Sequence, residues 1–367
     1  MHERLFETDV LTKLERVEAT LNLQPVDRAA LHDQVSYNPG VVAMYTGKAV
    51  QGFDYTMEDI CQVIRVTLDM CFRPRAPIGA ERVVSEDGFV SQHDNWTSWH
   101  VSRPFDDVHG AASWLGKRLK AMTEAAFDPA AEREAYREGM CSLQALVGET
   151  VICDYGGVGL SSCFDAMGLQ LFCYLYADHP ELVAEHIRLS AEHEVRRAQA
   201  VADVSLSPVY LIADDFATKQ GPIFSPAFLE REFFPHVRRV IEAWHGRGLK
   251  VLYHSDGNYR AVIPELIDAG ADGFYCLEPA VGMDAVELKR RWPHVVWAGG
   301  IDGVDLMERG APWQVREAVR RQVLQTSALE SGGLFVGSSS EINPPIKPEN
   351  YRAMVEAVGE LRNPAFG

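Results

Sequence analysis

The sequence predicts an α/β protein, namely a (β/α)8 barrel with an elaborated N-terminal region. From about residue 146 onward, short apolar runs alternate with helical stretches, a spacing typical of parallel strands connected by helices. The alternative is a doubly wound sheet, which gathers its ligand-binding residues at one switch point. In this chain polar residues follow every apolar run, and that is typical of the C-terminal mouth of a barrel.

The predicted strands are short apolar segments at 209–215, 249–254, 270–278, 294–302 and 333–338. Polar residues stand at or after their ends: Asp214, Asp215, His254, Asp256, Glu278, Asp302 and 338–341. Helices are predicted near 226–246, 262–267, 285–291, 313–331 and 347–361 from their apolar periodicity. The first of these begins at Ser225-Pro226, an N-cap followed by a proline, and ends near Gly246.

The first part of the chain, about 1–140, is less regular. The sequence of this part predicts a helix at 57–69, strands around 81–90, and a hairpin or long loop at 91–100 that is dense in aromatic residues and histidines. Long functional loops of this kind usually cover the mouth of a barrel. No linker or repeat stands out, so we expect a single domain over 1–367. In it, about 1–140 forms an N-terminal elaboration with the first barrel units, and about 141–367 forms the regular units.

Composition narrows the classes of partner. Aspartate and glutamate outnumber lysine and arginine by 52 to 35, which gives a net charge of −17. Such a charge excludes a general affinity for nucleic acid, which depends on cationic side chains, and it disfavours anionic membranes. No apolar run approaches the ~20 residues of a membrane helix, and the charged start is no secretory signal. The seven cysteines are scattered, so we expect reduced thiols and a cytoplasmic protein.

The most informative chemical motif is His254-Ser-Asp256, which has two polar side chains two residues apart. Cys276-Leu-Glu278, on the next predicted strand, has the same spacing. If strand geometry persists, the period of two places each pair on one face, and neighbouring strands lie about 4.8 Å apart. These nitrogen, sulfur and oxygen donors suit a zinc ion, with His254, Cys276 and Glu278 as predicted ligands. The alternatives are a carboxylate–imidazole pair without a metal and, for Cys276, a buried apolar role.

Asp214 and Asp215 end the preceding strand with carboxylates on opposite faces. One of them is expected to point into the barrel as an acid, a base or a substrate anchor. We therefore take Asp214, Asp215 and Asp256 as candidate catalytic residues. The alternative for each of the paired aspartates is a helix cap or an ion pair with Lys219.

Two further segments are candidate cofactor-binding sites. Around Gly299 and Asp302, paired glycines let the backbone approach a ligand closely, although a tight turn is the alternative. Trp96 and Trp99, with the histidines beside them, are large enough to wall an aromatic or corrin-sized ligand. Their alternative is a hydrophobic plug beneath a loop.

Several segments together resemble the uroporphyrinogen decarboxylase superfamily, which includes cobalamin-dependent methyltransferases. They are LTKLERVEATLNLQPVDR at 11–28, DDFATKQGPIFSP at 214–226, GLKVLYHSDGN at 248–258, GADGFYCLEP at 270–279, and 337–345 with 348–350. The resemblance spans most of the chain and implies a (β/α)8 barrel.

The absence of one family motif favours the methyltransferase branch, and two replaced ligands change the zinc site that this branch implies. The arginine-rich loop R-Q-A-G-R-Y of true decarboxylases is absent. The methyltransferases hold zinc with an H-x-C pair and a later cysteine; here His254 matches, Asp256 replaces the first thiolate, and Ser340 stands at the later position. The resemblance thus implies an oxygen-rich zinc site, a methoxylated or methylated small molecule as methyl donor, and transfer to a corrinoid carried by a partner protein with a complementary face.

Two other functions stay open at this point. One is a metal-free decarboxylase acting on a small or porphyrinogen-like acid, with Asp214 or Asp215 as proton donor. The other is a non-catalytic barrel that binds a ligand. A homodimer is a further expectation.

Overall fold

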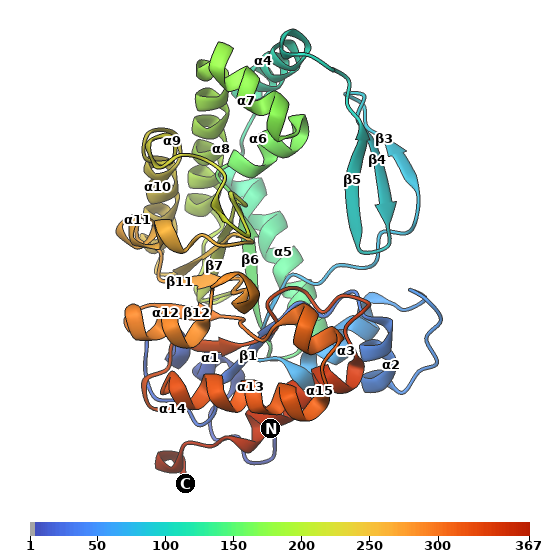
Figure 1. Cartoon of the computed structure of the whole chain (residues 1–367), viewed down its shortest axis with the longest axis vertical. Coiled ribbons are helices and arrows are strands. Elements are labelled where there is room, and N and C mark those ends of the chain that lie inside the picture. Colours follow the sequence, from blue (N-terminus) through green and yellow to red (C-terminus); the bar gives the residue numbers. More distant parts are fainter. Residues whose placement is uncertain (1–3) are drawn as a thin grey trace.

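The computed structural model describes residues 4–367 and contains a closed barrel of parallel strands (Figure 1). Around the barrel the strands are β1 (Ala30–Asp33), β13 (Leu334–Val336), β12 (Val296–Ala298), β11 (Gly273–Tyr275), β10 (Lys250–His254), β7 (Val209–Ala213), β6 (Val151–Gly156) and β2 (Met70–Phe72). Pairing of Leu31 with Val336 and of His32 with Met70 closes the ring through β1. The predicted barrel is confirmed, and the doubly wound alternative was wrong.

Helices surround the barrel. They are α1 (Lys13–Leu21), α2 (Pro39–Thr46), α3 (Met57–Thr67), α4 (Val108–Glu124), α5 (Pro129–Val147), α6 (Leu160–Met167), α7 (Leu169–Asp178), α8 (Pro180–Val201), α9 (Pro226–Glu232), α10 (Phe234–His245), α11 (Ile263–Asp268), α12 (Ala285–Arg291), α13 (Pro312–Gln325), α14 (Ala328–Ser331) and α15 (Pro348–Glu360). Short 3₁₀ turns η1 (Arg260–Val262), η2 (Pro279–Val281) and η4 (Pro364–Phe366), and a π-helical turn η3 (Gly303–Glu308), complete them.

Two predicted helices are each divided in the structure. The segment 226–246 forms α9 and α10, because Pro235 lies in the first turn of a new helix that starts after Phe233. The segment 313–331 forms α13 and α14, and Ser327 lies between them with a left-handed φ of 51°. Apolar periodicity does not reveal where one helix ends and the next begins, since the two helices of each pair bury the same face.

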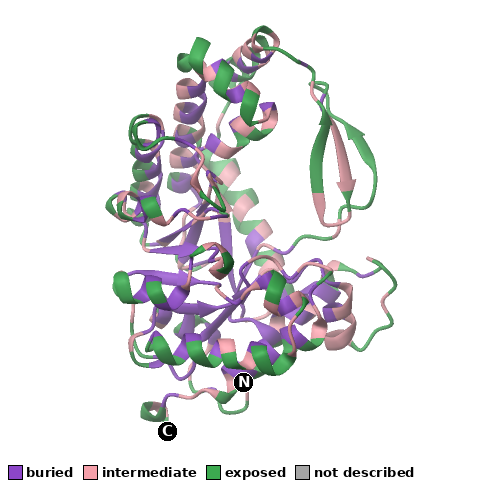
Figure 2. Cartoon of the chain, in the orientation of Figure 1, coloured by how far each residue is buried: buried purple, intermediate pink, exposed green. Residues whose placement is uncertain are grey.

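The irregular first part supplies two barrel strands, β1 and β2, together with a three-stranded antiparallel sheet. That sheet consists of β3 (Arg82–Val84), β4 (Val90–Asp94) and β5 (Thr97–Ser102), and we call residues 82–102 the arm. The arm stands apart from the barrel, and its strands are mostly exposed (Figures 1 and 2). The predicted hairpin is thus part of a sheet. A small ribbon of β8 (Ala217–Thr218) and β9 (Gly221–Pro222) follows β7.

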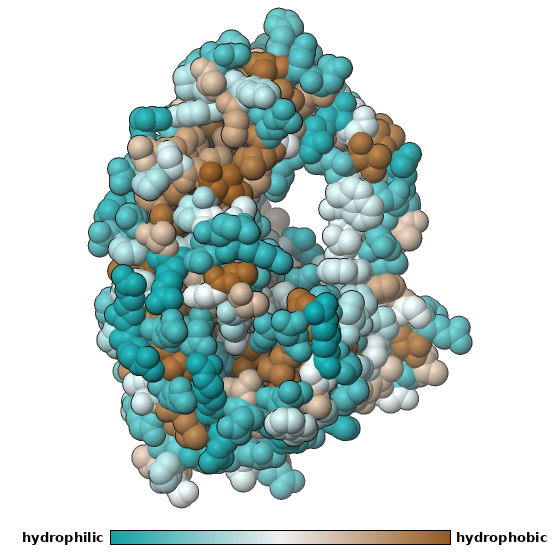
Figure 3. Space-filling model, in the orientation of Figure 1, coloured by the Kyte–Doolittle hydropathy of each residue, from teal (hydrophilic) through white to brown (hydrophobic). Residues whose placement is uncertain are grey.

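Both ends of the arm are attached to the rest of the molecule. At one end, the Phe89 ring lies 5.8 Å from that of Phe105 and 5.4 Å from that of Trp114 on α4. At the other end, Asn95 exchanges backbone hydrogen bonds with Ile78 and Gly79, in the segment that leaves the carboxyl end of β2. Figure 3 shows an opening between the arm and the body. Since the arm follows the carboxyl end of β2, it starts from the same end of the barrel as the candidate catalytic and metal-binding residues.

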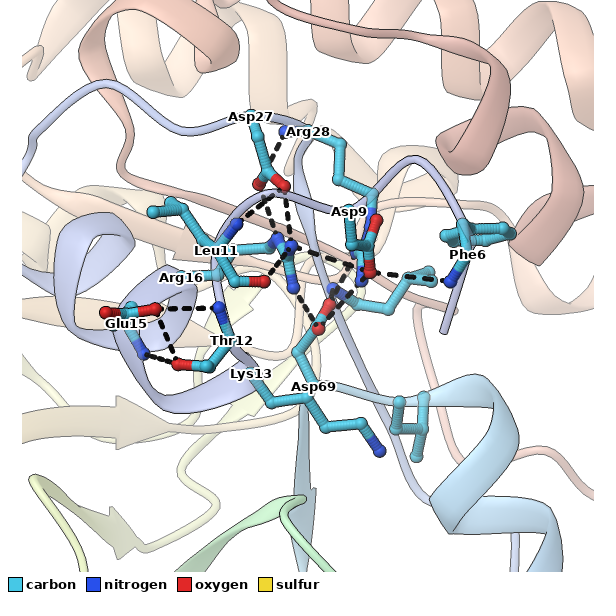
Figure 4. A network of polar contacts seen from close by, with 12 residues as sticks. Phe6, Asp9, Leu11, Thr12, Lys13, Glu15, Arg16, Asp27, Arg28 and Asp69 are labelled. Carbon is cyan, nitrogen blue, oxygen red and sulfur yellow. Dashed lines mark hydrogen bonds and ion pairs between the residues drawn. The ribbon is translucent and has the colours of Figure 1, made fainter. Parts of the chain in front are cut away.

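Apolar side chains fill the barrel and the layer between strands and helices, and the barrel strands are buried apart from some residues at their ends (Figure 2). The end of the barrel opposite the mouth is closed by a network of buried charges (Figure 4). Arg16 of α1 and Arg28 both bind Asp69, which precedes β2, at 2.8 and 2.7 Å. Asp27 and Asp9 complete the network by pairing with Arg16 and Arg28 respectively. The charges thereby fasten α1 to the barrel.

Across residues 4–367, no helix combines the length and the apolarity needed to cross a bilayer.

Candidate active site at the barrel mouth

His254 is the last residue of β10 and lies at the mouth of the barrel. Its ring stacks on that of Tyr275, the last residue of β11, with 5.4 Å between the ring centres. Nε2 lies 3.5 Å from Oδ1 of Asp215 and 3.9 Å from Oδ1 of Asp256. Nδ1 is buried and has no hydrogen-bond partner among the described residues. The imidazole therefore turns its Nε2 edge toward two carboxylates.

Carboxylates from the neighbouring strands fix the loop that follows β10. The backbone N–H of Asp256 donates to Oδ1 of Asp215 at 2.7 Å, and the N–H of Gly257 donates to Oε1 of Glu278 at 2.6 Å. Gly257 has a φ of 78°, and a Cβ there would lie 2.7 Å from the carbonyl oxygen of Thr218. Only glycine fits this close approach. The loop consequently holds Asp256 between the ends of β7 and β11.

The possible metal ligands form two groups that share Asp256. One group is Asp215, His254 and Asp256, and the other is Asp256, Cys276 and Glu278. Within each group the donor atoms lie within 4.8 Å of one another. The sequence-predicted set of His254, Cys276 and Glu278 is therefore not brought together as one group of three in the described chain. Strand periodicity missed this because β10 and β11 end at His254 and Tyr275, and the residues beyond follow loop geometry.

The donor chemistry of these residues fits a divalent cation such as zinc. One imidazole and the carboxylates of Asp215, Asp256 and Glu278 are ligands that zinc accepts. Cys276 is buried, and its thiol donates to the carbonyl oxygen of Ser339. Burial, together with the nearby Asp256 and Glu278 carboxylates, raises the pKa of this thiol. A metal would bind the sulfur only by displacing the proton, so the imidazole and carboxylates are the more accessible ligands.

Water reaches the Asp256 side chain, but the walls of the concave mouth partly desolvate it. This desolvation raises the pKa of the Asp256 carboxyl; the nearby His254 opposes the shift, and the Asp215 carboxylate adds to it. A carboxyl group with a raised pKa keeps its proton at a higher pH than usual and is suited to donating it.

A cavity of about 200 Å³ lies directly beside His254 and Asp256. Its walls are Gln34, Phe72, Tyr155, Leu211, Ala213, His254, Asp256, Tyr275, Cys276, Ser340 and Glu341. Ser340 and Glu341 were among the polar residues predicted at the mouth from sequence, whereas Gln34 and Tyr155 were not predicted as parts of the site. The signal for Gln34 was available, since His32-Asp33-Gln34 directly follows a short apolar run, as at the other strand ends.

Asp33, at the end of β1, is a buried carboxyl group beneath this cavity. Its Oδ1 accepts a hydrogen bond from the Gln34 N–H, and its Oδ2 accepts one from the Ser338 N–H, both at 2.9 Å. Burial raises the pKa of Asp33 to about 7, although these two hydrogen bonds oppose the shift. The side chain thus ties together the ends of β1 and β13, which carry Gln34, Ser340 and Glu341.

The two consecutive aspartates after β7 have different surroundings. Asp215 faces His254, whereas Asp214 is buried and accepts hydrogen bonds from the backbone N–H groups of Val158 and Ser161 at 2.5 and 2.9 Å, and from the Ser161 hydroxyl. Burial raises the pKa of Asp214 to about 6, against the effect of these hydrogen bonds. Asp214 therefore caps α6, as the capping alternative anticipated, and its carboxylate is not available to the mouth cavity.

The candidate cofactor-binding residues lie outside the walls of the mouth cavity. Gly299 has a φ of 99°, and its carbonyl accepts a hydrogen bond from the Gln322 side chain at 2.7 Å. Asp302 caps η3 by accepting from backbone N–H groups, the shortest at 2.6 Å from Asp305. Both residues serve a tight turn. Trp96 and Trp99 lie on the arm, where Trp99 is 51% exposed, so they form no buried plug.

Comparisons with known proteins agree with this architecture. Residues 165–361, more than half of the chain, match the family model described as uroporphyrinogen decarboxylase (URO-D). No curated protein matches the sequence.

Among solved structures, a methyltransferase from Methanosarcina mazei superposes with a TM-score of 0.66 at 17% identity, over 95% of this chain and 99% of its own. At this identity the likeness concerns the fold. A type I 3-dehydroquinate dehydratase from Clostridium difficile superposes with a TM-score of only 0.32 at 9% identity, over 66% of this chain and 86% of its own, which carries no information on function. The match to the family model, together with the barrel, shows that the chain belongs to the uroporphyrinogen decarboxylase (URO-D) family.

Proposed function

We propose that the chain is a corrinoid-dependent methyltransferase that demethylates a methoxylated or methylated small molecule. The observation that carries this proposal is the cluster of His254, Asp215 and Asp256 at the mouth, beside a cavity of about 200 Å³. This cluster combines donors for a metal with a carboxyl group suited to giving up a proton. The fold shared with the M. mazei methyltransferase along nearly its whole length also supports the proposal.

A zinc ion would be held by His254 with Asp215 and Asp256, or by Asp256 with Cys276 and Glu278. When bound, the metal supplies a Lewis acid that stabilises negative charge on a leaving oxygen. When docked, the corrinoid of a partner protein supplies the nucleophile that accepts the methyl group.

The residues of this chain prepare the substrate for that transfer. Without a bound metal, Asp256 holds a proton for the oxygen from which the methyl group departs, because its pKa is raised. With Asp256 as a metal ligand its carboxyl group would be deprotonated, and the metal would take over the stabilisation of that oxygen. Asp215 orients the Asp256 loop through the hydrogen bond from the backbone N–H and faces His254 with the same oxygen. Phe72 and Tyr275 supply apolar walls that exclude water from the reacting oxygen.

The test is methyl transfer itself. The purified chain is mixed with a panel of methoxylated aromatic acids, methoxylated phenols and methylamines, and with free cob(I)alamin or corrinoid proteins reduced to cobalt(I). We expect the absorption spectrum of methylcobalamin to appear with at least one donor, and the rate to fall by at least about 100-fold in Asp256→Asn, as for loss of a general acid. His179→Ala, a change at an exposed histidine on the helical surface, serves as the control. Failure with every donor and acceptor would exclude the proposal.

The second candidate is a metal-free decarboxylase of a small acid. It is favoured by the raised pKa of Asp256 beside Asp215, because a protonated carboxyl group at the mouth could protonate the carbanion left by carbon dioxide. Of the two proton donors considered from sequence, Asp214 is engaged by the backbone of Val158 and Ser161 and does not line the mouth cavity, whereas Asp215 faces His254. Release of carbon dioxide from acids without any corrinoid would favour this function over methyl transfer.

A further inference from the structure

A second and larger cavity lies beside the barrel mouth. Its volume is about 600 Å³, within the range of small-molecule sites. It is enclosed by the end of α4 and the residues after it, by α8, and by the segment that follows β6. Its walls include Arg118, Met122, Phe127, Tyr155, Ser161, Ser162, Leu189, Ser190, His193, Glu194, Arg196 and Asp214.

This cavity adjoins the mouth cavity. Tyr155 and Ala213 line both, so the two spaces lie on opposite sides of the ends of β6 and β7. Ala213 pairs with His254 in the sheet, which places the shared wall one strand from the candidate metal ligands. The half-buried Tyr155 side chain therefore forms part of the wall between the larger cavity and the reacting residues.

Two arginine side chains that form no ion pair within residues 4–367 line the larger cavity. Arg118 lies over the ring of Trp114 and Arg196 over that of Phe127, at 5.8 and 5.4 Å. Neither guanidinium forms an ion pair with a carboxylate of residues 4–367, and Nε of Arg196 is buried without an acceptor. This is unusual in a chain with 52 acidic residues against 35 lysines and arginines. Arg118 is exposed, whereas Arg196 is partly buried, and an unpaired, partly desolvated guanidinium such as that of Arg196 gains most from an anionic ligand.

The carboxylates that line the cavity are already engaged. Oε1 of Glu194 accepts a hydrogen bond from the Tyr210 hydroxyl at 2.6 Å and also faces Arg197. Both oxygens of Asp214 are taken by the backbone and the Ser161 hydroxyl. An anionic ligand would therefore meet Arg196, with no carboxylate paired to it among residues 4–367, and Arg118, which has only the more distant Asp87 carboxylate in its field. The remaining walls, Met122, Phe127 and Leu189, are apolar and suit the body of such a ligand.

We propose that this larger cavity binds the anionic end of the methyl donor, a carboxylate or phosphate carried on an apolar, ring-sized body, with Arg118 and Arg196 as its counter-ions. The methylated end of the donor then passes Tyr155 and lies beside His254. That the ligand is a methyl donor rests on the proposed function; that the cavity selects an anion does not.

The test is a set of binding measurements by calorimetry without any corrinoid. The probes are 4-methoxybenzoate, 4-methoxyphenyl phosphate and the neutral methyl 4-methoxybenzoate. We expect at least one anion to bind at least about 10-fold more tightly than the ester, as for one charge-assisted contact. The two anions distinguish a carboxylate from a phosphate as the preferred group.

The variants are Arg118→Gln, Arg196→Gln and the double change, with the exposed Arg309→Gln as a control of equal charge. Affinity for the preferred anion should fall at least about 10-fold in the double variant and stay unchanged in the control, while affinity for the ester stays the same in all. Equal binding of ester and anions, no binding of either anion, or full retention of affinity in the double variant would overturn the proposal. Circular dichroism and thermal unfolding establish that each variant is folded.

The outcomes separate this inference from the proposed function. Arginine-dependent binding of an anion without any methyl transfer would leave the anion site standing and refute the methyltransferase. Methyl transfer from an anionic donor with an unchanged KM in the double variant would leave the methyltransferase standing and refute the anion site.

Discussion

Oδ1 of Asp215 accepts the backbone N–H of Asp256 at 2.7 Å, and the same oxygen lies 3.5 Å from Nε2 of His254. One atom at the end of β7 thus positions both the loop and the imidazole that belong to β10. The carboxylate of Asp256 then stands within 4.8 Å of donor atoms from both neighbouring strands. The candidate chemistry accordingly depends on three adjacent strand ends rather than on one sequence motif.

We predict that the chain binds about one divalent metal ion and that His254→Ala loses it. The imidazole is the only nitrogen donor in either group of possible ligands among the described residues. Removing it leaves carboxylates and the buried Cys276 thiol, whose raised pKa makes it a poor ligand, and these hold zinc more weakly. Metal content is measured by elemental analysis after dialysis against zinc. His179→Ala, which removes an exposed surface histidine, should retain the metal. Equal metal content in the wild type and His254→Ala, or no metal in either, would contradict the prediction.

Asp33 should make the protein less stable as the pH rises. Its folded-state pKa is about 7, above the usual 3.8, because the group is buried. The folded state therefore favours the protonated form, so the contribution is complete below about pH 4 and is lost as the pH passes through about 7.

The measurement is the free energy of unfolding in urea at pH 5 and pH 8. One pKa unit corresponds to about 1.4 kcal/mol, so Asp33→Asn should reduce the loss between these pH values by about 2 kcal/mol. The variant is also expected to lose some stability at pH 5, since an amide cannot accept both hydrogen bonds. The exposed Asp305→Asn should keep the wild-type pH dependence. An identical pH dependence in Asp33→Asn and the wild type would speak against a buried, protonated carboxyl group.

Asp69→Asn should destabilise the fold severely. Burial alone would raise the pKa of Asp69, but Arg28 and Arg16 outweigh it and hold the pKa below its usual range. Removing this charge leaves two buried guanidiniums short of a partner, which costs about 3–5 kcal/mol. Urea denaturation measures the loss, and Asp305→Asn, at an exposed pair with Arg309, should cost less than about 1 kcal/mol. Similar stabilities of the two variants would refute a structural role for the network.

The arm offers a test of the sequence-based interpretation of Trp96 and Trp99. If Trp99 contacts the corrinoid or its carrier, Trp99→Ala should raise the concentration of corrinoid protein at half-maximal rate by about 10-fold or more, as for an interface tryptophan. Thermal unfolding should not change, because Trp99 is 51% exposed. Trp313, 68% exposed on α13, provides the matched control through Trp313→Ala. An effect of equal size in both variants would exclude a specific role for the arm.

The barrel could be predicted from sequence because its later strands are apolar runs of constant spacing that end in polar residues. The strand at 250–254 and the helix at 285–291 show this clearly, since structure and pattern agree there within a residue. The strands β1 and β2 have only four and three residues, so neither gives a periodic signal of its own. The arm was partly predictable from the alternation around 91–100, although its three-stranded form depends on pairing between β3 and β4.

The candidate site was predictable in its membership but not in its grouping. Asp256 lies within 4.8 Å of His254 in one group of donors and of Cys276 and Glu278 in another, because parallel strands end at the same edge. After β7, the Asp214 carboxylate accepts the backbone N–H of Ser161 in α6, whereas the Asp215 carboxylate faces His254. Sequence patterns do not encode such a choice. The environment of Arg118 and Arg196 could not be predicted either, since only the structure shows that neither forms an ion pair within residues 4–367.

The charge network around Asp69 has a consequence for how this barrel can change. It lies at the opposite end of the strands from His254, so the residues that secure the fold are not those that select the reaction. The mouth can therefore be rebuilt independently. A double change of Asp256→Cys and Ser340→Cys would place two thiols in the cavity that His254 lines and would leave the ion pairs of Asp69 at the opposite end untouched.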